Sequence, residues 1–261
     1  MFNIFIAFIY YIWQTISGVY SAMQLTKPTD RLPALSGIAT KYHESTGSRY
    51  LAGMWERDLL PQLCWQATTL ATESQRLTYP YHQYLSPSWS WVSISQPVIY
   101  NMNYLQSRIE PGVVVSDVQC EVPGLNPFGQ VTKGHLRLRG KITQICLDCD
   151  DPLRPWGYVV KNRSDWEFIP DCILREEGDN IVRASEGQIS SVFSANATCI
   201  FIGGQKVKQN MEGENMSFAL VLGRSNIDGD IFHRIGLLIS RDEDGFGCLF
   251  KVALNREVYI I

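Results

Sequence analysis

The chain has 261 residues, of which 45% are hydrophobic and 19% are charged, a composition typical of a folded globular protein. Its formal net charge is -3 and its Lys and Arg residues are scattered singly, so it lacks the positive field that a phosphate backbone requires, and we expect no nucleic-acid partner. Seven irregularly spaced cysteines suit a reducing compartment, and we expect a cytoplasmic location.

The first segment is predicted to be a packed amphipathic helix. Residues 1–13 contain one strongly polar side chain, but no Lys or Arg precedes Lys27, and the apolar run is shorter than the roughly 20 residues that a bilayer needs. Apolar residues then recur at helical spacing, at Ile12, Ile16, Val19, Tyr20 and Met23. We therefore favour a helix packed on the protein over a signal peptide or a membrane anchor, and we expect no membrane partner.

Two further helices are predicted before residue 70. The second helix has Thr29 or Asp30 as its N-cap and ends at Gly47. Its apolar face is predicted to consist of Leu35, Ile38, Ala39 and Tyr42. The third helix is predicted within residues 58–67, with Asp58 as its cap.

From Ser86 onward the pattern alternates, which predicts strands. In residues 134–142, Leu136 and Leu138 point to one face while His135 and Arg137 point to the other. Further strands are predicted at 192–202, 218–223, 233–240, 248–254 and 257–261. Turn signals separate them at 203–204, 226–230 and 242–245.

These elements predict one α+β domain over residues 1–261 with a single continuous core. Residues 1–70 form its helical part, a set of about three packed helices, and residues 86–261 form its β-rich part. Several short strands joined by hairpin turns are typical of a mostly antiparallel β sandwich or barrel.

No metal, cofactor or nucleophile motif is visible. The CLDC stretch at Cys146–Cys149 has no second metal-binding pair at the usual spacing, and we interpret it as a strand end followed by a turn. The four histidines fall in no metal-binding spacing, and we interpret His135 and His233 as solvent-facing strand residues. We therefore expect no metal and no cofactor.

Several motifs carry a family resemblance. LTKPTDRLPALSGIA (residues 25–39), SRYLAGMWERDLL (48–60) and SPSWSWVS (86–93) are followed by NPFG (126–129), GHLRLRGKI and RIGLLI. In this order they resemble the region that follows the HET domain in fungal heterokaryon incompatibility proteins. The resemblance covers roughly residues 10–261 and implies a β-rich tail. In that family the HET domain lies upstream and is thought to carry the cell-death signal, but this chain reaches the shared motif by residue 30. We expect the tail to have become a protein of its own, with a truncated gene model as the alternative.

The tryptophans define the candidate site. If residues 86–93 form a strand, Trp89 and Trp91 project from the same face. Trp55 and Trp65 come from the helical part, so four indoles are expected to converge where the helices meet the sheet. They are either packing residues of the core or the wall of a pocket for an apolar ligand. Nearby in sequence, His82 is the candidate proton donor.

Two functions remain open. The first is a cofactor-independent cyclase or isomerase, a pericyclase of the Diels–Alderase type, whose substrate is a hydrophobic fungal secondary metabolite such as a terpenoid or polyketide. In it His82 is the catalytic residue, and the substrate-binding residues are Trp55, Trp65, Tyr84, Trp89 and Trp91. The second is a non-enzymatic, incompatibility-type module for protein interaction or regulation. We favour the first, because a tail without its effector domain has lost the obvious way to signal. A homodimer is compatible with either.

Overall fold

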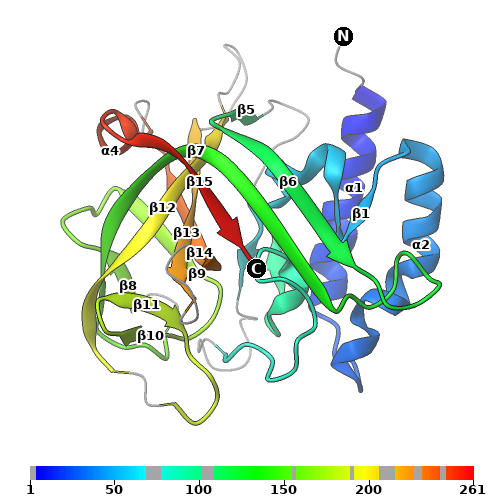
Figure 1. Ribbon diagram of the computed structural model, residues 1–261, viewed down its shortest axis with the longest axis horizontal. Coiled ribbons are helices and arrows are strands. Elements are labelled where there is room, and N and C mark those ends of the chain that lie inside the picture. Colours follow the sequence, from blue (N-terminus) through cyan, green and yellow to red (C-terminus); the bar gives the residue numbers. More distant parts are fainter. Residues whose placement is uncertain are drawn as a thin grey trace.

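In the computed structural model the long helices lie at one end of the molecule and most strands at the other (Figure 1). The structure describes residues 4–68, 78–100, 109–154, 157–188, 191–205, 215–225, 231–241 and 245–261. Its helices are α1 (Ile4–Ser21), α2 (Arg31–Thr46), α3 (Leu59–Gln62) and α4 (Gly247–Phe250), with 3-10 turns at Pro28–Asp30, Glu56–Asp58 and Trp91–Ser93. No helix in these ranges is both long and apolar enough to cross a bilayer.

Helix α1 buries only part of the predicted face, since Ile16 and Tyr20 pack against the core as predicted. Val19 and Met23 are exposed, whereas Tyr10, Trp13 and Ser17 are buried. The Trp13 indole determines this orientation, because its Nε1 donates a hydrogen bond of 2.9 Å to a backbone carbonyl in the loop at residue 53. Aromatic and polar groups with partners in the core therefore prevail over the aliphatic stripe.

Helix α2 starts and ends close to the predicted positions. Asp30 directly precedes it, although the Asp30 side chain makes no capping hydrogen bond. Gly47 ends the helix with φ of 60°, a left-handed conformation that favours glycine, and its N–H donates to the carbonyl of His43. Ile38 was predicted to be buried but is exposed.

The third predicted helix is reduced to the single turn of α3. Asp58 does not cap it, and the Asp58 carboxylate instead accepts a hydrogen bond from Gln62 Nε2 at 3.0 Å. The helix stops because the carbonyls of Leu63 and Trp65 accept hydrogen bonds from a buried arginine of the sheet, Arg234. A tertiary contact thus replaces the next helical turn.

The rest of the described fold is mainly an eleven-stranded sheet. Its strands are β5 (Ile109–Pro111), β6 (Val113–Glu121), β7 (Lys133–Cys149), β8 (Tyr158–Val160), β9 (Trp166–Pro170), β10 (Leu174–Glu177), β11 (Asn180–Arg183), β12 (Phe193–Gln205), β13 (Met216–Arg224), β14 (Ile231–Ser240) and β15 (Leu254–Ile260). Among the described pairings only β11–β12 and β14–β15 are parallel. Two short antiparallel pairs complete the strands: β1 (Tyr50–Leu51) with β2 (Met54–Trp55), and β3 (Gln66–Ala67) with β4 (Val98–Ile99).

The central strands close into a ring. Strand β12 pairs with β13, β13 with β14, β14 with β15, β15 with β7, and β7 again with β12. This closure confirms the predicted α+β, mostly antiparallel fold in its barrel form. The largest hydrophobic cluster extends from α2 into this barrel and includes Leu35, Trp65 and Leu136.

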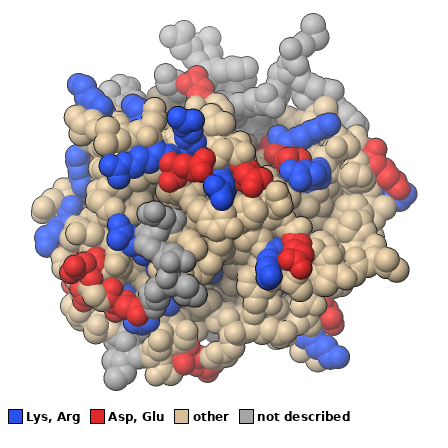
Figure 2. Space-filling model, in the orientation of Figure 1, with Lys and Arg blue, Asp and Glu red and all other residues tan. Residues whose placement is uncertain are grey.

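The register of β7 agrees with the alternation in the sequence. Leu136 and Leu138 are buried, while His135 and Arg137 lie on the other face. The strand ends at Cys149, as the interpretation of the CLDC stretch predicted. On the face shown in Figure 2, basic and acidic side chains are interspersed, with no large area of one sign.

Two strand-and-turn predictions are wrong. Residues 248–254 do not form a strand, because α4 occupies 247–250 and β15 begins only at Leu254. Residues 203–204 are not a turn but lie inside β12, where the register shifts and Gly203 adopts φ of 155°. There a Cβ atom would stand 2.3 Å from the carbonyl oxygen of Glu110, so glycine allows β5 to approach. The predicted turns at 226–230 and 242–244 lie outside the described residues.

Candidate functional site

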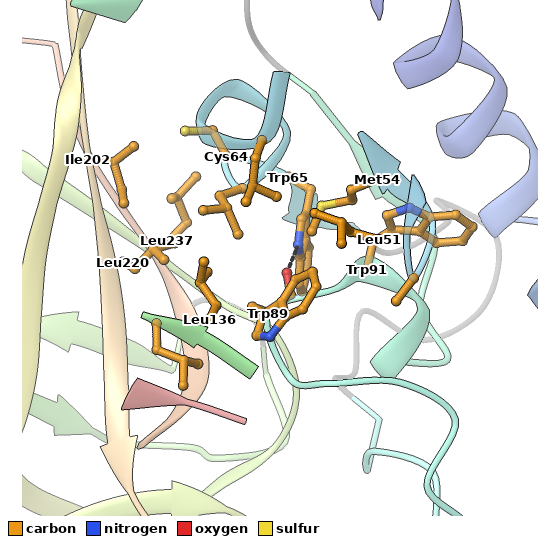
Figure 3. Packing of buried hydrophobic residues seen from close by; sticks show 14 of the residues in the cluster. Leu51, Met54, Cys64, Trp65, Trp89, Trp91, Leu136, Ile202, Leu220 and Leu237 are labelled. Atoms are coloured by element: carbon orange, nitrogen blue, oxygen red, sulfur yellow. Dashed lines mark hydrogen bonds between the residues drawn. The ribbon is translucent and has the colours of Figure 1, made fainter. Parts of the chain in front are cut away.

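The four predicted site tryptophans are packing residues of the core, each with 0% of its surface exposed. Trp65, Trp89 and Trp91 belong to the cluster that joins the helices to the sheet (Figure 3). Trp55 belongs to a separate cluster around Trp13. The structure therefore does not bring all four indoles around one space.

The segment 86–93 is not a strand, which corrects the basis on which Trp89 and Trp91 were paired. The chain turns at residues 88–90 and continues as a 3-10 turn, Trp91–Ser93. The two residues consequently contact the helical part in different ways: the backbone carbonyl of Trp89 accepts from Trp65 Nε1 at 2.9 Å, whereas the indole of Trp91 donates from Nε1 to the carbonyl of Gly53 at 3.1 Å.

The serines between these tryptophans are also buried and hydrogen-bonded. Ser90 Oγ donates to the carbonyl of Ala52 at 2.6 Å and accepts from the N–H of Val92. Ser88 Oγ donates to the carbonyl of Ile261 and accepts from the N–H of Arg234. Indoles and hydroxyls together make this segment the junction between helices and barrel.

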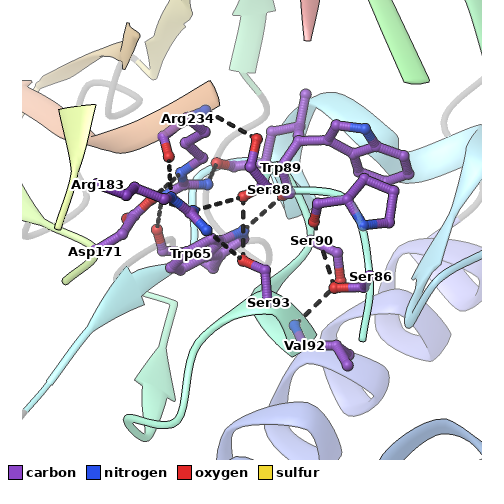
Figure 4. A network of polar contacts seen from close by, with 12 residues as sticks. Trp65, Ser86, Ser88, Trp89, Ser90, Val92, Ser93, Asp171, Arg183 and Arg234 are labelled. Atoms are coloured by element: carbon purple, nitrogen blue, oxygen red, sulfur yellow. Dashed lines mark hydrogen bonds and ion pairs between the residues drawn. The ribbon is translucent and has the colours of Figure 1, made fainter. Parts of the chain in front are cut away.

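A buried ion-pair network lies next to the junction (Figure 4). Arg234 and Asp171 are both 0% exposed, and the guanidinium donates to the two carboxylate oxygens at 3.0 and 3.2 Å. The remaining guanidinium donors reach the carbonyls of Leu63 and Trp65 at 2.6 Å each, and the Arg234 Cζ lies 3.4 Å from the Trp65 ring centroid. Every polar edge of Arg234 is thus used for structure.

A second guanidinium, that of Arg183, completes the network. It lies 3.6 Å from the Asp171 carboxylate and donates to the carbonyls of Arg234 and Ser88. Burial raises the pKa of Asp171, and the two arginines oppose that rise. Sequence reasoning missed this network, although a charged residue inside the apolar RIGLLI strand was a usable signal for Arg234.

His82 and Tyr84 lie at the surface. The His82 side chain is 66% exposed, and its Nε2 pairs with the carboxylate of Glu186. Tyr84 is 44% exposed and lines a groove of about 600 Å³ beside His135 and Tyr259. Because the site indoles have no exposed surface, His82 shares no solvent-filled pocket with them.

The other two strand histidines differ in exposure. His135 Nε2 pairs with Asp117 at 2.7 Å, and this bond lowers the pKa of the Asp117 carboxyl. His233 was expected to face solvent but is largely covered. Burial and, to a smaller extent, the charge of Arg183 lower the pKa of His233 to about 4, against the opposing effect of a hydrogen bond to the backbone of Ile261.

A larger groove, which we call the phenylalanine groove, lies between β12 and α4 and measures about 840 Å³. Its lining residues are Gly112, Lys141, Phe201, Ser217, Phe246, Gly247, Phe250 and Lys251. The ring centroids of Phe201 and Phe250 are 5.4 Å apart, and those of Phe246 and Phe250 are 5.9 Å apart. Three phenyl rings thus form an apolar floor, of which Phe201 is partly exposed while Phe246 (3% exposed) and Phe250 (4%) also belong to the core cluster of the barrel.

Gly112 shapes this floor. A Cβ atom at Gly112 would stand 2.2 Å from the ring of Phe201, so only glycine lets the ring lie flat at this position. The rim is polar and cationic, because Lys141 and Lys251 are exposed and Ser217 contributes a hydroxyl. Neither lysine forms an ion pair with another described residue. Sequence reasoning missed this groove because its residues come from five separate segments.

Within the described ranges, no three His, Cys, Asp or Glu side chains are placed to hold a metal ion. The tryptophan cluster is closed, the surface around His82 is open, and the phenylalanine groove combines an apolar floor with hydrogen-bond donors. Of these three places, the phenylalanine groove has the makeup of a small-molecule site. Comparison of the chain with protein-family models, with curated proteins and with solved structures gave no match.

Proposed function

We propose that this protein binds a hydrophobic small molecule in the phenylalanine groove and acts on it as a cofactor-independent cyclase or isomerase. The observation that carries the proposal is the set of three phenyl rings, Phe201, Phe246 and Phe250, facing a groove of about 840 Å³. That volume lies within the range of roughly 300 to 1,000 Å³ found for small-molecule sites. A terpenoid- or polyketide-sized molecule fits it.

Such a reaction needs few protein groups. A flexible apolar substrate gains reactivity when a surface holds its reacting ends together, and the phenyl floor would supply that restraint. A donor aimed at a substrate carbonyl would stabilise the charge that develops during ring closure. Ser217 and the two rim lysines are the donors beside the floor. The tryptophans enter this proposal only as the core that supports the barrel.

Binding is tested with Nile red, a neutral dye whose fluorescence rises in apolar surroundings. Phe250→Ala should weaken dye binding about tenfold, because losing contact with a phenyl ring costs about 1.5 kcal/mol. Phe128→Ala is the matched control, since Phe128 is also buried (8% exposed, against 4% for Phe250) but belongs to the separate cluster around Trp13. Equal binding by all three proteins would refute the site.

Turnover is tested by metabolite profiling. A fungal strain lacking the gene should accumulate an uncyclised apolar precursor, and the Phe250→Ala protein should fail to restore the product while Phe128→Ala restores it. If the dye binds in the groove but the profiles do not differ, the protein is a binding module and the catalytic half of the proposal is rejected.

The second candidate function, a protein-interaction or regulatory module, is favoured by one observation. Helix α1 exposes Phe8, Tyr11 and Val19, and Ile99 of β4 is exposed beside them along a groove of about 390 Å³. Exposed apolar strips of this kind are covered by partners in many proteins, and a second copy of the chain is one such partner. If the protein is an interaction module, Val19→Asp should abolish its biological phenotype. If it is a cyclase or isomerase, the same change should leave the phenotype unchanged. Sedimentation of the same variant tests the homodimer.

We further propose kinship with the region that follows the HET domain in fungal incompatibility proteins, and a cytoplasmic location. The order of the motifs from residue 25 to residue 239 supports the kinship. A chimera in which this chain replaces the corresponding region of an incompatibility protein tests it. Retention of the incompatibility reaction would support kinship, and loss of the reaction with a folded chimera would contradict it.

A further inference from the structure

We infer that the ligand of the phenylalanine groove is an amphiphile with a single carboxylate, whose apolar chain lies on the phenyl rings and whose head group lies between Lys141 and Lys251. This inference rests on the proposed function, because it presupposes that the groove binds an apolar molecule. It adds the chemical class of the ligand and the direction in which it lies.

The charge of the rim carries the inference. Lys141 belongs to β7 and Lys251 follows α4, so the fold brings two cations from distant segments to one groove. Neither lysine pairs with a described acidic residue, whereas Lys41 pairs with Glu44 and Lys161 with Asp148. None of the lining residues within the described ranges is acidic.

Lys27 and Lys133 likewise form no ion pair with a described residue, so what distinguishes Lys141 and Lys251 is their position at one groove. Two ammonium groups at the rim of an apolar floor leave a place for an anion from outside. The apolar floor excludes a small, strongly hydrated anion as the main ligand, since such an ion gains nothing from three phenyl rings. An anionic head attached to an apolar chain satisfies both parts of the groove.

The number of head-group charges follows from the exposure of the lysines. Both are exposed at the rim, and no arginine is among the lining residues that the structure describes. Exposed lysine pairs of this type contribute up to about 1 kcal/mol each, which corresponds to about fivefold in affinity. Two such contributions suit a carboxylate, while the apolar chain supplies most of the binding free energy.

The test measures how well dodecanoic acid and its neutral methyl ester displace Nile red from the parental protein. The same two titrations are repeated with Lys141→Gln, Lys251→Gln and the double variant. The acid should bind more tightly than the ester, by up to about 25-fold at low salt. Each single variant should weaken acid binding by up to about fivefold, and the double variant should bind acid and ester equally. Ester binding should stay unchanged in all three.

Lys133→Gln is the matched control, because Lys133 is an exposed lysine at the start of the strand in whose middle Lys141 lies, and it lines a different groove. If Lys133→Gln weakens acid binding as much as the groove variants do, the effect is one of net charge and the inference is overturned. If acid and ester displace the dye equally from the parental protein, the inference is also overturned but the proposed apolar site stands. If neither displaces a dye that Phe250→Ala does release, the groove takes a different class of ligand and the inference fails. If none of the groove variants changes dye binding, the proposed function itself is refuted.

Discussion

Replacing Asp171 with Asn should strongly destabilise the protein. The Asp171 carboxylate is fully buried and lies 3.0 Å from one guanidinium and 3.6 Å from a second. Its removal leaves two cations facing each other without a counter-charge. Asn keeps the shape of the side chain but presents an amide, part of which must face donors of Arg234.

The free energy of unfolding should fall by about 3–5 kcal/mol, the range observed when one charge of a buried ion pair is removed. Arg234 keeps its two carbonyl acceptors and its contact with Trp65, which argues for the lower half of that range. Replacing both partners, Asp171→Leu with Arg234→Met, should cost less than the single Asp171→Asn change, because the fully buried cation is removed together with the carboxylate and only Arg183, whose side chain is 12% exposed, loses a counter-charge.

Urea unfolding followed by tryptophan fluorescence measures the effect, since the buried indoles become exposed on unfolding. The slope with denaturant should stay constant while the midpoint falls. Glu44→Gln is the control, because its ion pair with Lys41 is exposed and should be worth less than about 1 kcal/mol. A loss of under about 1 kcal/mol for Asp171→Asn would refute the reasoning.

Three further outcomes are expected. His233→Gln should make the free energy of unfolding less dependent on pH between 6.5 and 4. Burial lowers the pKa of His233 from 6.5 to about 4, so the unfolded chain binds the proton more tightly, and up to about 3 kcal/mol of stability present above pH 6.5 is lost as the pH falls towards 4. Urea unfolding midpoints of the parental protein and the variant across this pH range measure the difference. Gly112→Ala should cost about 1–3 kcal/mol by calorimetry because its Cβ meets the Phe201 ring, whereas Gly124→Ala, with open space around it, should change little. His82→Ala should alter neither stability nor dye binding measurably, and a tenfold loss of binding would place the site elsewhere.

The sequence was sufficient to predict the fold class because its strongest patterns are local. The alternation in β7 and the glycine that ends α2 are each set by neighbouring residues, and both are where the patterns put them. The failures are tertiary. Helix α3 is cut short by an arginine 171 residues away, and the PSWSW segment turns because its serines find partners at Ala52 and Ile261. Propensity cannot anticipate such contacts.

The candidate site was less accessible to sequence reasoning for the same reason. Tryptophans are candidate ligand-binding residues in any sequence, but their large apolar surface makes them core residues wherever the fold can enclose them. The phenylalanine groove, in contrast, is assembled from residues that range from 112 to 251, and no spacing marks them as neighbours. Two of its features, a glycine under a ring and two lysines without acidic partners among the described residues, exist only in three dimensions.

The junction between helices and barrel has a consequence for synthesis on the ribosome. Arg234 bonds to Leu63 and Trp65 across 171 and 169 residues, and Ser88 reaches Ile261 across 173. At about 5–20 residues per second, the first third of the chain waits roughly 10 to 30 seconds for the strands that enclose its indoles. Until then Trp65 and Trp89 are exposed apolar side chains on a nascent polypeptide and favour aggregation. A chaperone that covers them during this interval would raise the yield of native protein.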